Sequence, residues 1–333
     1  MKAAQIEKYS KDINVSINEI AIPEPKDNEV LIKVKAAAVN PVDILIITGS
    51  IRLIQDYSMP LALGNECSGI VEKVGNKVKD FRIGDKVYTR LPINKIGAFA
   101  EYVTVAHDAV SPMPASYEFI PAAAIPLTGL TAYQGITEEL GAQSGDTLLI
   151  TGGSGSFGQM AVPIAKAMGL HVIVTGNARA QERFNEMGVD QYINYRKENY
   201  WEILSQIDYV IDTLGAAEFK HELSVLRKGG TLLSLRIGPN RIFAQKNGFS
   251  WLKQFLFSLA GSKYDRAAHK QDKQYRFMFV HSDGAQLREI TKIVEKYHIV
   301  PDVDSRIFSL SQINDALKLV AHGTLNGKVI IQF

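Results

Sequence analysis

Hydrophobic and polar positions follow a strand-like pattern through the first third of the chain. Short apolar runs are separated by turn residues such as Pro23, Gly64 and the pair Gly84-Asp85. These runs predict strands at residues 2–6, 15–20, 30–39, 67–74, 86–89 and 100–105. Because this stretch contains few helical patterns, it predicts a compact, barrel-like β domain.

The pattern changes near residue 115, and helices then alternate with strands. Residues 121–140 place Leu127, Leu130, Tyr133 and Ile136 at helical spacing. Further apolar runs predict strands at residues 147–151, 171–175, 191–194, 209–212, 231–235 and 277–280. This alternation indicates a doubly wound parallel sheet. The tail from residue 286 predicts two helices and strands at 306–310 and 328–333.

A glycine-rich turn follows the first strand of this α/β part. Its spacing is Gly152, Gly155 and Gly158, ahead of an alanine-rich helix. Glycine permits a tight turn and lets a pyrophosphate approach bare N–H groups at the helix N-terminus. Gln159-Met160 follows where a P-loop needs Lys and Ser/Thr, and no G-x-S-x-G nucleophile elbow is present. We therefore interpret the turn as a dinucleotide site, with a plain β–α turn as the alternative. The candidate residues are Gly152, Ser154, Gly155, Ser156, Phe157 and Gly158.

The end of the second strand bears on which nucleotide binds. The run there is Thr175-Gly176-Asn177-Ala178-Arg179, and no carboxylate appears before Glu182. NAD sites usually place an acidic residue here for the ribose hydroxyls. Arg179 is instead placed to pair with a 2′-phosphate, although it is also typical of a solvated helix start. The sequence therefore favours NADP(H).

Composition excludes several classes of protein. The 333 residues suggest two domains or one large one, and the net charge of +2 with no basic patch predicts no nucleic-acid binding. The single cysteine, Cys67, excludes a disulfide framework and a cysteine-based structural zinc site. No apolar stretch of about 18 residues exists, so no integral membrane segment is expected. No signal peptide is visible, and we expect a cytoplasmic protein.

Residues 240–274 do not fit a short connection in the α/β part. The run 249–259 is apolar on most faces, and the basic residues Lys263, Arg266, Lys270 and Lys273 follow it. A helix that is apolar all round must be covered. A partner subunit, the roof of the cofactor cleft and a membrane surface remain open as the cover, and we expect a homodimer.

Several sequence blocks, in order, match one known family. They include residues 37–43 (AAVNPVD), 64–69 (GNECSG), 84–87 (GDKV), 97–102 (GAFAEY), 126–133 (PLTGLTAY) and the glycine turn. On these blocks the chain resembles the zinc-independent quinone oxidoreductases of the medium-chain dehydrogenase/reductase superfamily over essentially its whole length. The resemblance implies a Rossmann doubly wound parallel sheet inserted into a bent, GroES-like β domain built from both chain ends. Residues 1–120 and 283–333 would form this catalytic β domain, and residues 121–282 the NADP(H)-binding domain.

The resemblance also implies the chemistry. Asn40 and Asn65 stand where zinc-dependent relatives have Cys and His, and an amide is a poor zinc ligand, so no metal is predicted. Without a Lewis acid, the expected hydride acceptor is a quinone or an α,β-unsaturated carbonyl, with NADPH as donor. The catalytic candidates are Asn40, Thr128 and Asp43. Helix capping is the alternative for Asp43.

Further cofactor contacts are implied by matching family positions. Tyr195 matches a 2′-phosphate contact, Asn40 and Thr128 lie near the nicotinamide, and Lys328 is either a cofactor contact or a solvated strand residue. The remaining cofactor candidates are Asn177, Arg179, Leu214, Gly215, Phe279 and Val280. An NADPH-binding regulatory protein without turnover is the alternative function. The sequence does not name the physiological substrate, nor does it say whether one or two electrons pass to a quinone.

Overall fold

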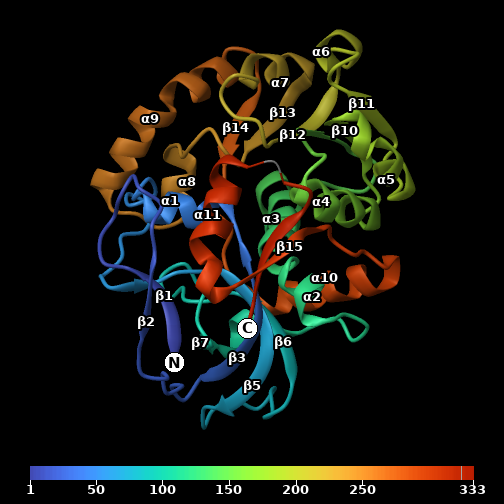
Figure 1. Ribbon diagram of the computed structural model, residues 1–333. Helices are drawn as coiled ribbons and strands as arrows, with labels where there is room; N and C mark the ends of the chain where they lie inside the picture. The colour runs from blue at the N-terminus through green and yellow to red at the C-terminus, as the bar shows by residue number, and fades with distance from the viewer. Residues whose placement is uncertain (324) are drawn as a thin grey trace. The chain divides into compact units, whose positions relative to one another are not determined.

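The computed structural model describes residues 1–323 and 325–333 and divides the chain into two compact units (Figure 1). The terminal unit contains residues 1–130 and 281–333, and the central unit contains residues 131–280. The sequence analysis expected the divisions after residues 120 and 282. Helix α2 (Phe119–Ala123) explains the first difference, because Ala123 and Ala124 pack in one buried cluster with Ala36, Ala38 and Ile330 of the terminal unit.

A seven-stranded sheet forms the core of the terminal unit. Its order is β15-β16-β3-β5-β6-β8, with β7 as a further partner of β3. The strands are β3 (Glu29–Val39), β5 (Glu66–Val74), β6 (Lys86–Arg90), β7 (Tyr102–Ala106), β8 (Val110–Pro112), β15 (Val303–Ser309) and β16 (Lys328–Gln332). Strand β16 pairs antiparallel with β3, with Val329 opposite Val39. Both ends of the chain therefore build one β unit, as the family resemblance implied.

A smaller sheet and several helices complete the terminal unit. The small sheet has the order β2-β1-β4, from β1 (Lys2–Ile6), β2 (Ser16–Glu19) and β4 (Leu61–Ala62). The helices are α1 (Pro41–Ile47), α2, most of α3 (Pro126–Gln134), α10 (Gly284–Tyr297) and α11 (Ile313–His322). The buried Tyr88 ties α10 to β6, because its hydroxyl lies 2.7 Å from Thr291 Oγ1 and donates to Leu287 O at 3.1 Å.

The central unit is built on a six-stranded parallel sheet with the order β11-β10-β9-β12-β13-β14. The strands are β9 (Thr147–Thr151), β10 (His171–Gly176), β11 (Gln191–Asn194), β12 (Ile207–Asp212), β13 (Leu226–Ser234) and β14 (Gln274–Phe277). When the strands are numbered in sequence order within this unit, with β9 first, their order in the sheet is that of the Rossmann fold. The strand order reverses between β9 and β12. The predicted doubly wound sheet is confirmed. Ligands of such sheets bind outside the carboxyl ends of the strands at this reversal point.

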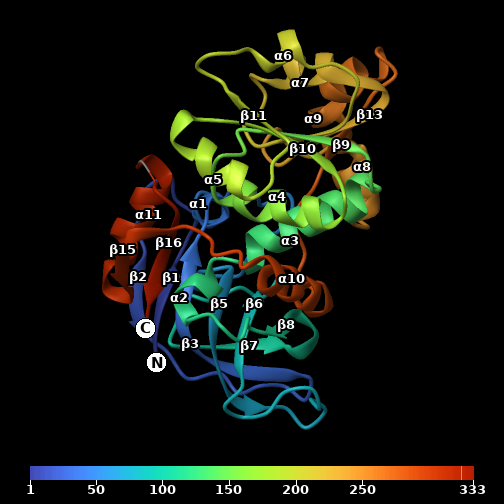
Figure 2. The ribbon, with the colours of Figure 1, turned by 90° about the vertical axis from the view of Figure 1, so that its right-hand side faces the viewer.

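Helices cover both faces of the central sheet. They are α4 (Ser156–Ala167), α5 (Gln181–Glu186), α6 (Tyr200–Ile203), α7 (Phe219–Val225), α8 (Arg241–Lys246) and α9 (Trp251–His269). Helices α4 and α7 lie on opposite faces (Figure 2), as right-handed crossovers on either side of the reversal point require. Short helical turns of other types lie at His107–Ala109, Gly135–Leu140, Ala178–Ala180 and Leu310–Gln312.

The last strand of the central sheet differs from its prediction. The sequence placed it at 277–280, but β14 ends at Phe277. Its register explains the shift, because Gln274 pairs with Thr231 and Phe277 with Ser234, where β13 ends. Phe279 and Val280 therefore lie beyond the sheet.

Candidate active site and nucleotide site

The glycine turn lies at the reversal point of the central sheet, between β9 and α4. Gly158 is required for packing, because a Cβ there would lie 1.7 Å from the carbonyl oxygen of Gly153. A Cβ on Gly155 would meet nothing within 4 Å. Gly155 is the N-cap of α4, and no side chain caps this helix. The turn thus leaves open space beside uncapped N–H groups, which is the arrangement that binds phosphate.

Hydrogen bonds fix the glycine turn to the end of β10. The Gly152 N–H donates to Thr175 Oγ1, and the Gly153 N–H donates to the Thr175 carbonyl oxygen, both at 2.9 Å. Asn177 Nδ2 donates to Ser154 Oγ at 3.2 Å. The structure therefore brings together the two candidate segments, 152–158 and 175–179, that the sequence analysis linked to the nucleotide.

Three residues near this sheet edge carry the charge and aromatic surface expected for a 2′-phosphate. Arg179 is exposed, and its backbone N–H donates to Asn177 Oδ1. Tyr195 is exposed and follows β11, whose Asn194 pairs with Gly176. The guanidinium of Arg196 lies 5.9 Å from the centroid of the Tyr195 ring. The sequence analysis missed Arg196, although its place directly after Tyr195 was a usable signal.

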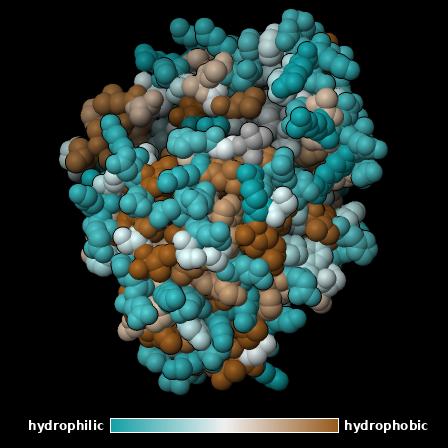
Figure 3. Space-filling view, viewed as in Figure 1, coloured by the Kyte–Doolittle hydropathy of each residue, from teal (hydrophilic) through white to brown (hydrophobic). Residues whose placement is uncertain are grey.

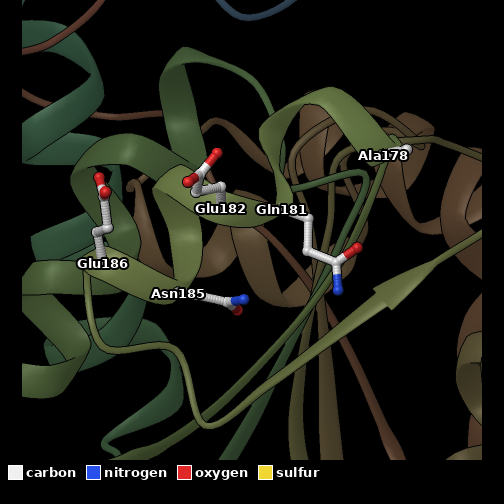
Figure 4. A pocket seen from close by; sticks show the side chains of 5 residues that line it. All are labelled: Ala178, Gln181, Glu182, Asn185 and Glu186. Atoms are coloured by element: carbon white, nitrogen blue, oxygen red, sulfur yellow. The ribbon is translucent and has the colours of Figure 1, made fainter.

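An open hollow of about 660 Å³ lies against α5 (Figure 4). Its lining contains Ala178, Gln181, Glu182, Asn185 and Glu186. Two carboxylates would repel a phosphate, so this hollow does not suit the charged part of a nucleotide. Arg179 does not line it.

The end of β12 meets the glycine turn from the other side of the reversal point. Asp212 Oδ1 accepts hydrogen bonds from the N–H groups of Leu214 and Gly215, both at 2.7 Å. A Cβ on Gly152 would lie 2.4 Å from Leu214 Cδ2, so Leu214 packs directly on the turn. Asp212 is buried and shapes the loop that holds Leu214 and Gly215.

In the terminal unit, the candidates Asn40 and Asp43 join a buried polar network at the start of α1. Asp43 Oδ2 accepts the backbone N–H of Asn40 at 2.7 Å, which is the helix-capping role considered from the sequence. Asp43 Oδ1 accepts a hydrogen bond from Asn65 Nδ2 at 2.7 Å. Burial, more than any neighbouring charge, raises the pKa of Asp43 to about 7.

Glu66 and Lys328 form a buried ion pair at the centre of this network. Lys328 Nζ lies 2.9 Å from Glu66 Oε1, which also accepts Asn40 Nδ2 at 2.8 Å. Glu66 Oε2 accepts the backbone N–H of Leu127 at 2.7 Å. The side chains are 0% exposed for Glu66 and 5% exposed for Lys328. Lys328 is therefore not the solvated strand residue that the sequence left open.

The two amide and hydroxyl donors predicted for catalysis already have partners inside the protein. Asn40 Nδ2 donates to Ala38 O at 3.1 Å as well as to Glu66. Thr128 Oγ1 donates to Ala124 O at 3.1 Å. Each would have to exchange a hydrogen bond in order to donate one to a substrate.

Nearby, a second group of buried polar atoms has no hydrogen-bond partner in the described part of the chain. These atoms are Arg90 Nε and Nη2, Tyr57 Oη and Asn65 Oδ1. Arg90 is fully buried, and burial lowers the pKa of its guanidinium to about 10, so the group stays charged at neutral pH. Sequence reasoning missed Arg90, although a charged residue closing the apolar strand KVYTR was a visible signal. Unsatisfied buried donors of this kind call for an explanation.

Comparison with known proteins places the chain in a family. Residues 26–115 match the model for the alcohol dehydrogenase GroES-like domain, and residues 187–331 match the model for zinc-binding dehydrogenases. The chain is 30% identical over 357 residues to the NAD(P)H oxidoreductase RTN4IP1, mitochondrial, of Danio rerio, which covers 99% of this chain and 91% of that protein. It superposes on the quinone oxidoreductase of Coxiella burnetii with a TM-score of 0.83 and 26% identity, over 100% of this chain and 99% of that one. The chain belongs to the quinone oxidoreductases of the medium-chain dehydrogenase/reductase superfamily.

Membership of this family confirms the resemblance seen in the sequence and makes the protein an oxidoreductase of the quinone and enone reductase type. A further relative is the 2-methylene-furan-3-one reductase of Solanum lycopersicum, 29% identical over 341 residues, which cover 99% of this chain and 79% of that protein. In the described part of this quinone oxidoreductase, no helix is long and apolar enough to cross a membrane. The roles of its individual site residues stay predictions.

Proposed function

We propose that the protein transfers hydride from NADPH to a quinone or an α,β-unsaturated carbonyl, without a metal ion. The observation that carries this proposal is the glycine turn at the reversal point of a Rossmann-ordered sheet, followed by a β10 end that holds Arg179 in place of an acid. The names of the relatives, an NAD(P)H oxidoreductase, a furanone reductase and a quinone oxidoreductase, support the same reaction class.

A nicotinamide dinucleotide fits the residues of the central unit. The open space at Gly155 and the uncapped start of α4 would hold the pyrophosphate. Asn177 and the Leu214-Gly215 backbone flank that position, and Arg179, Tyr195 and Arg196 supply the surface for a 2′-phosphate. When bound, the cofactor supplies the hydride.

The residues at the family's zinc position do not fit a zinc ion. Asn40 and Asn65 offer amides where zinc prefers thiolate or imidazole. Both oxygens of Glu66 are engaged, and one of them lies 2.9 Å from the Lys328 ammonium. The described residues contain no group of three or more His, Cys, Asp or Glu side chains that could hold a metal ion. We therefore assign no step to a metal.

The protein's part in the reaction is to bind the acceptor and stabilise charge on its oxygen. When hydride adds to a carbon conjugated with a carbonyl group, the electron pair moves onto that oxygen, and water later protonates the product. Asn40 and Thr128 remain the donors proposed from the family. Arg90 and Tyr57 of the same unit hold buried donors that have no partner among the described residues, and the Arg90 charge favours a developing anion.

The test is a nucleotide titration by intrinsic fluorescence on the wild type, Arg179→Ala and the control Arg241→Ala. Arg241 is also an exposed arginine of the central unit, at the start of α8. We expect wild type and control to prefer NADPH over NADH, and Arg179→Ala to lose at least about tenfold in NADPH affinity, or about 1.4 kcal/mol. Equal, weak binding of both nucleotides would contradict the proposal for the cofactor.

Stopped-flow loss of NADPH absorbance with a panel of enones and quinones tests the reaction itself. Tight NADPH binding without hydride transfer to either class would favour the alternative, a regulatory NADPH-binding protein. The cytoplasmic location and the homodimer also stay predictions. One relative is named as mitochondrial, so the compartment needs its own measurement.

A further inference from the structure

Helix α9 presents a row of large apolar side chains to solvent. Trp251 is 79% exposed, Phe255 56% and Leu259 59%, and Leu252 and Leu256 are also exposed. We call these five residues the α9 apolar face. Figure 3 shows hydrophobic side chains gathered where Figure 1 draws α9. The sequence analysis expected this segment to be covered, and within the described chain it is not.

The packing of α9 on the central unit fixes which side faces outward. Phe257, Gly261 and Ala268 are its buried residues. A Cβ on Gly261 would lie 2.5 Å from the Cβ of Asn240, so the helix is held tightly there. With 3.6 residues per turn, the α9 apolar face lies on the side opposite these residues.

The same outward side becomes basic in the second half of the helix. Lys263, Arg266 and Lys270 are exposed and follow the apolar face at helical spacing. Asp265, the one acidic residue between Trp251 and Lys270, accepts a hydrogen bond from Asn240 Nδ2 at 2.7 Å and is not fully exposed. The outward side of α9 therefore combines aromatic and aliphatic surface with positive charge that has no acidic partner among the residues that the structure describes.

We propose that α9 docks on an anionic lipid surface, with its apolar face in the headgroup boundary and its three cations on the lipid phosphates. Helices that carry Trp, Phe and Leu together with Lys and Arg lie in the plane of such interfaces. The proposal is independent of the hydride-transfer reaction.

Charge decides against a second copy of the chain as the occupant. If two α9 helices packed in parallel, the cations of one would face the cations of the other. If they packed antiparallel over their full length, the cations of each would lie on the apolar face of the other and lose water without a counter-charge. An anionic lipid surface offers an apolar environment for the α9 apolar face and phosphate groups for the cations that follow it.

Fluorescence of Trp251 tests the proposal on the full-length protein. The chain has two tryptophans, Trp201 and Trp251, so Trp201→Phe leaves Trp251 as the sole tryptophan probe. The Trp201 ring stacks on His221 with centroids 3.7 Å apart, and phenylalanine retains an aromatic ring there. We expect a blue shift with phosphatidylcholine vesicles that contain phosphatidylglycerol, none with phosphatidylcholine alone, and reversal by salt.

Co-sedimentation with the same vesicles separates the two halves of the helix. Phe255→Ser with Leu259→Ser, and separately Lys263→Gln with Arg266→Gln and Lys270→Gln, should each lower vesicle binding at least about tenfold. The control, Lys197→Gln with Lys220→Gln, removes two exposed cations elsewhere on the central unit and should bind as the wild type does.

Three results would overturn the proposal. The first is no binding to anionic vesicles, and the second is undiminished binding by either α9 variant. The third is that the wild type does not bind vesicles but self-associates without lipid, as measured by sedimentation velocity, and that Phe255→Ser with Leu259→Ser abolishes this self-association. That last result would make a second copy of the chain the occupant.

Discussion

Glu222 is a fully buried carboxyl group of α7, beneath the loop that shapes the nucleotide side of the central unit. Its Oε1 accepts a hydrogen bond from Thr151 Oγ1 at 2.5 Å, at the end of β9. Burial and, secondly, the negative charge of Asp212 raise the pKa of Glu222 to about 9. Glu222 is therefore neutral at pH 7 in the folded protein, where an exposed glutamate would be ionised.

This raised pKa makes the free energy of unfolding depend on pH. A folded-state pKa above the unfolded value means that the folded state holds the proton more tightly. The contribution of Glu222 to stability is thus fully present below pH 4.5 and is lost as pH rises toward about 9. At pH 7 the difference from 4.5 is 2.5 pH units, and at about 1.4 kcal/mol per unit the loss is about 3 kcal/mol. Glu222→Gln stays neutral in both states and should avoid this loss.

The assay is urea unfolding at a series of pH values between 5 and 8. We expect Glu222→Gln to be more stable than the wild type at pH 7, by up to about 3 kcal/mol, and to show a smaller fall of stability as pH rises. Glu198→Gln, an exposed position of the same unit, should leave the profile unchanged. If the variant and the wild type lose stability in parallel over this range, Glu222 is not the buried neutral acid described here.

Two further predictions concern the ion pair and the glycine turn. Lys328→Met should lower the free energy of unfolding by about 3–5 kcal/mol, because it leaves Glu66 buried without its counter-charge, and adding Glu66→Gln should recover much of that loss in urea unfolding. A double variant no more stable than the single one would show that the pair is not the source of the effect. Gly158→Ala should destabilise the central unit, since its Cβ would lie 1.7 Å from a backbone oxygen, whereas Gly155→Ala should keep wild-type stability and lose NADPH affinity. Wild-type melting of Gly158→Ala would refute the packing argument.

Local patterns were enough to predict the parallel sheet of the central unit, whereas the β unit built from both chain ends followed from the family resemblance. The glycine turn between two apolar runs predicted the first β–α–β unit because turn chemistry and strand propensity act within about 30 residues. The alternating strands from residue 191 to 235 were predicted for the same reason. The position of β14 was not, because Tyr275 to Val280 is uniformly strand-like and the end of β13 sets its register.

The candidate site was harder to predict because its contacts join distant parts of the sequence. Asn40, Asp43 and Lys328 were predicted singly, but nothing in the sequence paired Lys328 with Glu66, 262 positions away (328 minus 66). Arg90 was missed because a single basic residue at the end of a strand is usually solvated. Its importance appears only in the fold, where burial leaves the guanidinium atoms Nε and Nη2 without acceptors in the described part of the chain.

The buried network of the terminal unit joins the candidate site to the fold. Lys328 opens the last strand, while Glu66 opens β5, and their ion pair adds to the hydrogen bonds between β16 and β3. Asn40 links the same carboxylate to the start of α1, where Asp43 caps the helix. Removing either partner of the ion pair therefore leaves a buried charge unpaired, and it also loosens the strand that closes the β unit. For this reason we expect substitutions at Glu66 and Lys328 to alter stability and turnover together, whereas Arg179→Ala should alter nucleotide preference alone.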